Sequence, residues 1–209
     1  MFKRIIEDVT AVRARAPAAR NFWEVFFLYP GVKAIRMPRR APFYYKHNLK
    51  FLARWVSQRA VRKTGIEIHP GATIGRRLVI DHGVGNVIGA TTESGDDGLI
   101  YQGVTLGGTG KDVGKRHPTI GNNVMISAGA KVLGPFKIGD NSRVAAGAVV
   151  LNEVPPNSTV VGVPARVVKQ DGKRVALDQI HIPDPVKQKM DALEERILLL
   201  EAALKEKSK

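Results

Sequence analysis

The sequence predicts a β-helix that follows a basic α-helical region and precedes a single helix with coiled-coil spacing. Three patterns support this fold class. Apolar residues recur at helical spacing in residues 1–64, an aliphatic residue returns at every sixth position in residues 65–168, and a heptad pattern lies in residues 169–209. We therefore expect a central coil with a helical appendage at each end.

Residues 65–168 hold the hexapeptide repeat. An α-helix cannot place every sixth residue on one face, whereas short strands joined by corners can. Glycine often follows the aliphatic position, and Gly, Asn and Asp at the corners supply the positive φ angles that the turns require. The phase slips by two residues after Ile80 and is broken between Leu106 and Ile120. The aliphatic residues in phase are Ile68, Ile74, Ile80, Ile88, Ile100, Leu106, Ile120, Ile126, Val132, Ile138, Val144 and Val150.

Two positions inside the array do not fit the repeat. Ser94 occupies an inward position, and Gly98 stands where neighbouring repeats carry a small apolar residue. A buried hydroxyl without a partner costs about 1–3 kcal/mol. We therefore expect the coil to be locally loose at this turn.

Residues 1–64 are predicted to be helical and strongly basic. Ile5, Ile6, Val9 and Val12 recur at spacings of three or four, and a second apolar stripe follows Tyr44. Residues 1–65 hold 15 Lys and Arg against 3 Asp and Glu, which accounts for most of the net charge of +14. Such a segment could bind nucleic acid or an anionic membrane. No nucleic-acid motif accompanies the charge, so we interpret the region as helices that pack on their apolar stripes and expose a basic face.

Residues 169–209 are interpreted as a polar linker followed by a helix that begins after Pro183-Asp184-Pro185. Its apolar residues alternate spacings of four and three, which is typical of a coiled coil. A single helix of this kind is marginal in isolation. We expect it to associate with other copies, and docking on the body is the alternative. The seam residues are Val186, Met190, Leu193, Ile197, Leu200 and Leu204.

The composition excludes several classes of site. The chain has no cysteine, which excludes disulfides, thiolate metal sites and a cysteine nucleophile. No run approaches the ~20 apolar residues that a membrane helix needs. Acidic residues follow the first apolar residues, so the start lacks the apolar core of a signal peptide. We expect a cytoplasmic protein.

Both interruptions of the repeat carry histidine. The slip directly follows Asp81-His82, and the interrupting loop 107–118 ends in Arg116-His117-Pro118. Long loops on rigid scaffolds often carry function. Glu67 adds a carboxylate one residue before the first inward position of the coil. These residues are the candidates for chemistry.

Side chains of these kinds suit acyl transfer to an alcohol. An alcohol is a poor nucleophile at neutral pH and needs a base that takes its proton as it attacks. Imidazole titrates in the right range, and a carboxylate can hold its tautomer. Arginine suits the carboxylate of an amino-acid acceptor. The backbone N–H groups of Gly107-Gly108 could stabilise the oxyanion.

Five motifs closely resemble those of the serine O-acetyltransferases. They are Ile66-Glu67-Ile68-His69-Pro70, Ile80-Asp81-His82, the run QGVTLGGTGK from Gln102 to Lys111, Arg116-His117-Pro118, and Gly162-Val163-Pro164-Ala165-Arg166. The resemblance spans about residues 5–168. It implies a left-handed parallel β-helix that forms a homotrimer, with active sites between neighbouring subunits. It also implies acetyl transfer from acetyl-CoA to L-serine, giving O-acetylserine in the first step of cysteine biosynthesis, without a metal ion.

The same resemblance implies a role for each motif residue. His82 would be the general base, and Glu67 would orient it. Serine would be held by Asp81, Arg116 and His117. The CoA arm would lie along the coil near Gly108, Thr109, Ala128, Gly129 and Ala146, with Lys131 and Arg166 near its phosphates.

The chain departs from the family pattern at several places. The family usually has Asp at the position of Ala16, Glu at Ala90 and His at Pro42. Relatives that dock into O-acetylserine sulfhydrylase do so with a C-terminal Ile, whereas this chain ends in Lys209, so we expect no such docking. The helical region is shorter than in the long, hexameric type, which favours a trimer.

Three alternatives stay open. The first is an acetyltransferase on the same scaffold that acts on a sugar or antibiotic hydroxyl. The second is a trimeric zinc enzyme of the γ-carbonic anhydrase kind. Its zinc needs three histidine ligands, and this chain offers His69, His82 and His117. The third is a weakened or inactive trimeric scaffold whose basic region binds an anionic surface.

Overall fold

The computed structural model describes residues 2–110, 113–174, 193–194 and 196–197. Residues 1–175 form one compact unit, and residues 176–209 form a second. In the second unit Leu193 and Ile197 are helical and exposed. The other seam residues and Lys209 lie outside the described residues, so the coiled coil and the absence of C-terminal docking stay predictions.

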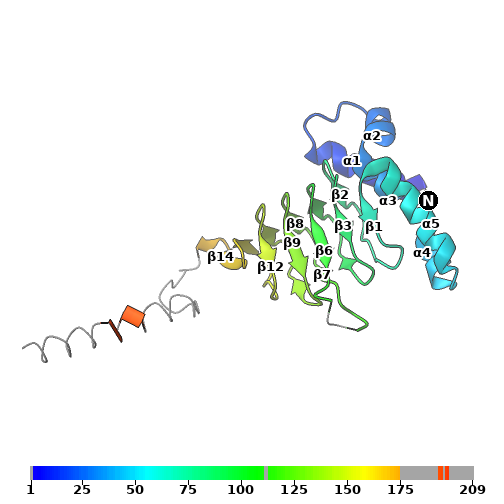
Figure 1. Ribbon diagram of the computed structural model, residues 1–209. Helices are drawn as coiled ribbons and strands as arrows, with labels where there is room; N and C mark the ends of the chain where they lie inside the picture. Colours follow the sequence, from blue (N-terminus) through cyan, green and yellow to red (C-terminus); the bar gives the residue numbers. More distant parts are fainter. Residues whose placement is uncertain (1, 111–112, 175–192, 195, 198–209) are drawn as a thin grey trace, which may run out of the picture. The chain divides into compact units, whose positions relative to one another are not determined.

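The first unit is a coil of short strands that form three sheets (Figure 1). Sheet A contains β1 (Glu67–Ile68), β3 (Val87–Ile88), β6 (Thr105–Gly107), β9 (Lys131–Leu133) and β12 (Val149–Val150). Sheet B contains β4 (Glu93–Ser94), β7 (Thr119–Ile120) and β10 (Lys137–Ile138). Sheet C contains β2 (Val79–Ile80), β5 (Leu99–Ile100), β8 (Met125–Ile126), β11 (Arg143–Val144), β13 (Ser158–Val161), β14 (Arg166–Gln170) and β15 (Lys173–Arg174).

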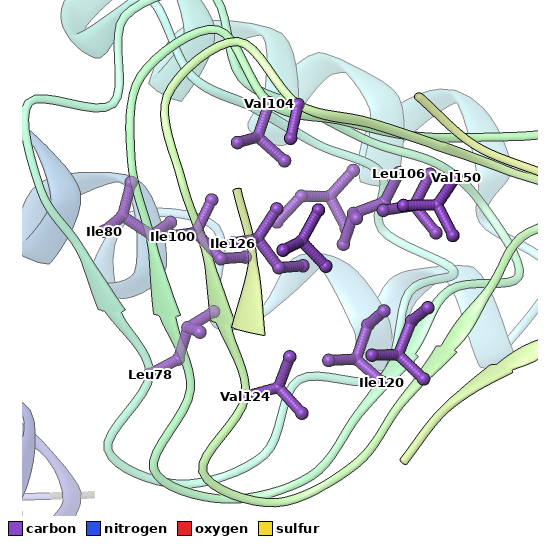
Figure 2. Close-up of a cluster of buried hydrophobic side chains, with 14 of the residues drawn as sticks. Leu78, Ile80, Ile100, Val104, Leu106, Ile120, Val124, Ile126 and Val150 are labelled. Carbon is purple, nitrogen blue, oxygen red and sulfur yellow. The ribbon is translucent and has the colours of Figure 1, made fainter. Parts of the chain in front are cut away.

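Strand pairing confirms the hexapeptide interpretation. Val132 pairs in parallel with Val150, 18 residues later, so three hexapeptides complete one turn. Ile80 pairs with Ile100, 20 residues later, because the slip adds two residues. From Ile80 onward every residue of the predicted in-phase set is buried, and Figure 2 shows many of these side chains stacked inside the coil. The first two, Ile68 and Ile74, are only partly buried.

The predicted looseness near Ser94 and Gly98 is wrong. The Ser94 hydroxyl is half-buried and accepts a hydrogen bond from the Gly75 N–H at 3.1 Å, so it has a partner on the preceding turn. A Cβ at Gly98 would lie 2.8 Å from Leu78 Cδ1, so the missing side chain leaves the space that Leu78 fills. Neighbouring turns therefore compensate for both residues.

Five helices cover the N-terminal end of the coil (Figure 1). They are α1 (Phe2–Arg15), α2 (Phe22–Leu28), α3 (Pro30–Arg36), α4 (Ala41–Lys46) and α5 (Lys50–Thr64). Val9, Val12 and Val25 form a cluster with Val79, the outward-facing residue of β2, so the first apolar stripe packs as predicted. Ile6 is an exception and is half exposed.

The second apolar stripe packs differently from the prediction. The buried residues of α5 are small, namely Ala53, Ser57, Ala60 and Thr64, and their size lets the helix approach its neighbours closely. Phe51 is 86% exposed and Trp55 is 47% exposed. Part of the aromatic face therefore points outward, because the small residues occupy the inward side.

The C-terminal end of the coil extends beyond the expected limit. Residues 169 onward were expected to be a linker, but β14 runs to Gln170 and pairs antiparallel with both β13 and β15. A two-residue turn at Asp171-Gly172, where both φ angles are positive, reverses the chain. No helix in the described residues is long and apolar enough to span a membrane.

Candidate active site

The two residues added by the slip form a protruding corner that carries His82. The φ angles of His82, Gly83 and Gly85 are +58°, +62° and +78°. The Gly83 N–H donates to the Asp81 carbonyl at 2.7 Å, which makes the turn tight. A Cβ at Gly83 would lie 2.5 Å from Ile66 Cδ1, and the positive φ angle disfavours other residues, so glycine is favoured there. The corner pushes the His82 side chain outward, where it is 76% exposed.

The carboxylates near His82 do not hold its ring. Asp81 Oδ1 lies 3.9 Å from His82 Nε2, which is too far for a hydrogen bond. Glu67 lies on the neighbouring segment, because its N–H donates to the Asn86 carbonyl at 2.9 Å. Its carboxylate, however, pairs with Arg54 of α5, with 3.3 Å between Nη1 and Oε1. The orienting role of Glu67 toward His82 therefore stays a prediction.

The end of loop 107–118 is fastened to the preceding turn of the coil through Thr91. The Thr91 hydroxyl accepts hydrogen bonds from the N–H groups of Arg116 and His117, at 3.0 and 3.1 Å. Its own proton is therefore available for His117 Nδ1, which lies 2.8 Å away. Lys115 Nζ adds hydrogen bonds to the Thr91 carbonyl and to Glu93. Sequence reasoning missed Thr91 and Lys115 as parts of the site.

These contacts define the state of the His117 ring. The Thr91 N–H also donates to Nδ1, at 3.2 Å, so Nδ1 is an acceptor and the proton of a neutral ring lies on Nε2. Burial lowers the pKa of His117, and the nearby cations Arg116 and Lys115 lower it further. A Cβ at Gly89 would lie 2.0 Å from His117 Cδ2, so the ring packs against bare backbone. His117 can therefore act as a neutral hydrogen-bond donor through Nε2.

His82 and the loop lie at opposite edges of sheet A, where an edge means the side at which the strands begin or end. The His82 corner leads into β3, whereas the loop leaves from the end of β6, and these two strands are parallel neighbours. Among the described residues, no hydrogen bond or ion pair joins His82 to Arg116 or His117. The described residues of one chain therefore do not bring His82 and the loop together.

His69 lies on the loop side of sheet A, away from the His82 corner. Burial lowers the pKa of His69, the charge of Arg54 lowers it further, and Nδ1 accepts the Gly71 N–H at 2.9 Å. His69 and His117 thus share one edge, while His82 occupies the other. Within the described part of the chain, no three His, Asp or Glu side chains converge as metal ligands.

The residues expected near CoA divide between the same two edges. Ala128-Gly129 and Ala146 lie on later turns at the same corner of the coil as His82. There the Gly129 N–H donates to the Gln102 carbonyl, and the Gly147 N–H donates to the Ala128 carbonyl. Ala128, Gly129 and Ala146 themselves contribute only backbone and methyl groups to this corner. Lys131 Nζ is bound there, 2.6 Å from the Gly103 carbonyl.

The remaining CoA candidates lie elsewhere. Gly108 and Thr109 belong to the loop edge, and a Cβ at Gly108 would lie 2.8 Å from the Arg116 carbonyl oxygen. Arg166 is exposed at the start of β14. The structure thus brings Ala128, Gly129 and Ala146 together but separates them from the loop within one chain.

Comparisons with known proteins agree with this architecture. The family model "Bacterial transferase hexapeptide (six repeats)" matches residues 117–152. The chain is 52% identical over 208 residues to a serine acetyltransferase of Bacillus subtilis, covering 99% of this chain and 96% of the relative. It is 53% identical over 197 residues to that of Staphylococcus xylosus, covering 93% and 91%.

Solved structures give the same result. The serine acetyltransferase of Neisseria gonorrhoeae matches with a TM-score of 0.79 at 41% identity, covering 82% of this chain and 67% of that one. The enzyme of Brucella abortus strain S19 in complex with coenzyme A matches with a TM-score of 0.78 at 42% identity, covering 81% and 68%.

The hexapeptide coil and the two histidine-bearing interruptions define a transferase of the hexapeptide-repeat class, whose coil is a left-handed β-helix. Half of the residues are identical to those of the bacillary relative over nearly the full length of both chains. The chain belongs to the serine acetyltransferase family, and it is an acyltransferase.

Proposed function

We propose that this enzyme transfers the acetyl group of acetyl-CoA to the hydroxyl of L-serine, with His82 as the general base. The main evidence for this activity is the sequence identity of about one half with serine acetyltransferases over nearly the full length of the chain. The solved relatives include one in complex with serine and one in complex with coenzyme A. The product is O-acetylserine, so the enzyme serves cysteine biosynthesis, and acetyl-CoA is a co-substrate. A cytoplasmic location is part of the proposal.

The exposed ring of His82 suits the proton transfers. Its Nε2 takes the hydroxyl proton as the serine oxygen forms a bond to the thioester carbonyl carbon. The tetrahedral intermediate then collapses, the carbon–sulfur bond breaks, and the imidazolium returns the proton to the CoA sulfur. The absence of a hydrogen bond between Asp81 and Nε2 supports this role, because the nitrogen stays accessible to substrate.

The loop supplies complementary groups for the acceptor. Arg116 is exposed, and its guanidinium suits the serine carboxylate. His117 adds a neutral donor at Nε2, which Thr91 orients. Asp81 beside the base suits the serine ammonium group. Because His82 and the loop lie at opposite edges of sheet A, we infer that these groups meet between subunits of a homotrimer.

Release of the CoA thiol from acetyl-CoA tests the proposal. Wild-type protein should release thiol only with L-serine, and His82→Ala should lower kcat by about 100-fold to 10,000-fold. L-homoserine, a galactoside and chloramphenicol test the other acceptors. Serine-dependent release that survives His82→Ala would refute the role of the base, and release with another acceptor alone would refute serine.

A further inference from the structure

The helical cap closes the first turn of the coil incompletely. Ile68 and Ile74 are in phase with the buried core, yet they are only partly buried, because no earlier turn covers them. Ala34 and Ile35 of α3 pack on this end of the coil. A cavity of about 340 Å³ remains between the helices and the first turn. Its apolar wall consists of Ile35, Pro38, Pro42, Ile68, Pro70, Ala72 and Ile74.

Basic residues exceed acidic ones around this cavity. Arg4, Arg39, Arg40 and Arg76 line it, together with Glu7 and Asp8. Arg39 pairs with Asp8, and Arg76 pairs with Glu7, so both carboxylates are neutralised. In the described part of the chain Arg4 and Arg40 form neither an ion pair nor a hydrogen bond. Both side chains are exposed and can reach a ligand, although the charge of Arg4 also acts on Asp8, where it opposes the rise in the carboxyl pKa that burial causes.

The interior of the cavity is poorly solvated. Asp8 is 8% exposed, and burial raises the pKa of its carboxyl despite the adjacent Arg39. Burial also lowers the pKa of His69, which lines the same cavity. Arg4 and Arg40 are exposed, so water partly screens their attraction for an anion, and the apolar wall must supply the rest of the affinity. The volume also falls within the usual range of ligand pockets, about 300–1,000 Å³.

We propose that this cavity binds a small organic carboxylate with an apolar body. The carboxylate lies near Arg4 and Arg40, and the apolar body packs on Ile68 and Ile74. The cavity includes neither His82 nor loop 107–118, so this proposal is independent of the acetyl transfer. Because Glu67 and Ile68 form the same short strand, an occupant contacts the strand that carries a predicted active-site carboxylate.

Isothermal titration of the full-length protein with octanoate tests the proposal, and octylammonium is the matched probe of opposite charge. Octanoate should bind saturably at one site per chain, about tenfold or more tightly than octylammonium. The double variant Arg4→Gln, Arg40→Gln should weaken octanoate about tenfold. Arg62→Gln, which removes an exposed cation of α5 outside the cavity, should leave it unchanged.

A cavity-filling variant tests the apolar part separately. Ile74→Trp should abolish octanoate binding while the protein still unfolds cooperatively. Absence of octanoate binding to the wild type would overturn the proposal. Equal binding of the two probes, or binding that neither the arginine pair nor Ile74→Trp reduces, would overturn it as well. Since the readout is binding, failure here leaves the serine acetylation assay unaffected.

Discussion

Thr91→Val should loosen the end of loop 107–118 without altering the proposed base, His82. The change removes a hydroxyl that accepts from two backbone N–H groups and lies 2.8 Å from His117 Nδ1. Each such hydrogen bond contributes about 1 kcal/mol, and a buried donor without a partner costs about 1–3 kcal/mol. The Arg116 N–H is on an exposed residue and can regain a water partner, whereas His117 is buried. The local destabilisation is therefore about 2–3 kcal/mol.

That free energy has two measurable consequences. Opening of the loop end should become about 30-fold to 150-fold more frequent, since 1.4 kcal/mol corresponds to a factor of about ten. Hydrogen exchange of the amides of Arg116 and His117 reports this directly. In the thiol-release assay the KM for serine should rise about tenfold or more, while kcat changes by less than about threefold, because the base is unaltered.

Thr91→Ser is the matched control, because it keeps the hydroxyl and removes only a methyl group. It should retain nearly wild-type exchange and KM. If Thr91→Val matched Thr91→Ser in both measurements, the hydroxyl would not hold the loop, and the reasoning would be refuted. A fall in kcat with KM unchanged would instead place the loop in the chemical step.

Three further predictions concern the assembly, the pH dependence and the helical cap. In the proposed trimer, His82→Ala and His117→Ala subunits mixed in equal amounts should recover about a quarter of wild-type activity, because random assembly combines two intact edges at that frequency. No recovery would place both residues in one subunit's site. The pKa of His117 lies below 6.5 in the folded protein, so the unfolded chain binds more protons and the free energy of unfolding should fall as the pH drops below 6.5. Urea titrations at about pH 5 and about pH 7 measure this fall, which His117→Asn should reduce. Gly31→Ala should cost about 1–3 kcal/mol, because its Cβ would lie 2.0 Å from the Ile80 carbonyl oxygen, and a Tm equal to wild type would contradict that packing.

Local patterns in the sequence predicted the coil and the position of its interruptions. The spacing of Ile126, Val132 and Ile138 was sufficient, because inward positions recur with the same period wherever the chain turns the same way. The slip after Ile80 and the break after Leu106 also marked where side chains leave the coil. The expected looseness at Ser94 was wrong because its partner, Gly75, lies on another turn, 19 residues away.

The sequence by itself thus determined the coil and identified the residues exposed at its interruptions, since a six-residue period and its breaks are local properties of the chain. Only the tertiary structure decided which groups meet. Thr91 holds His117 across 26 residues, and Arg54 of α5 pairs with Glu67. It also placed His82 and the loop at opposite ends of the strands of sheet A. Contacts of this kind depend on the stacking of turns and the docking of helices, and no short-range spacing encodes them.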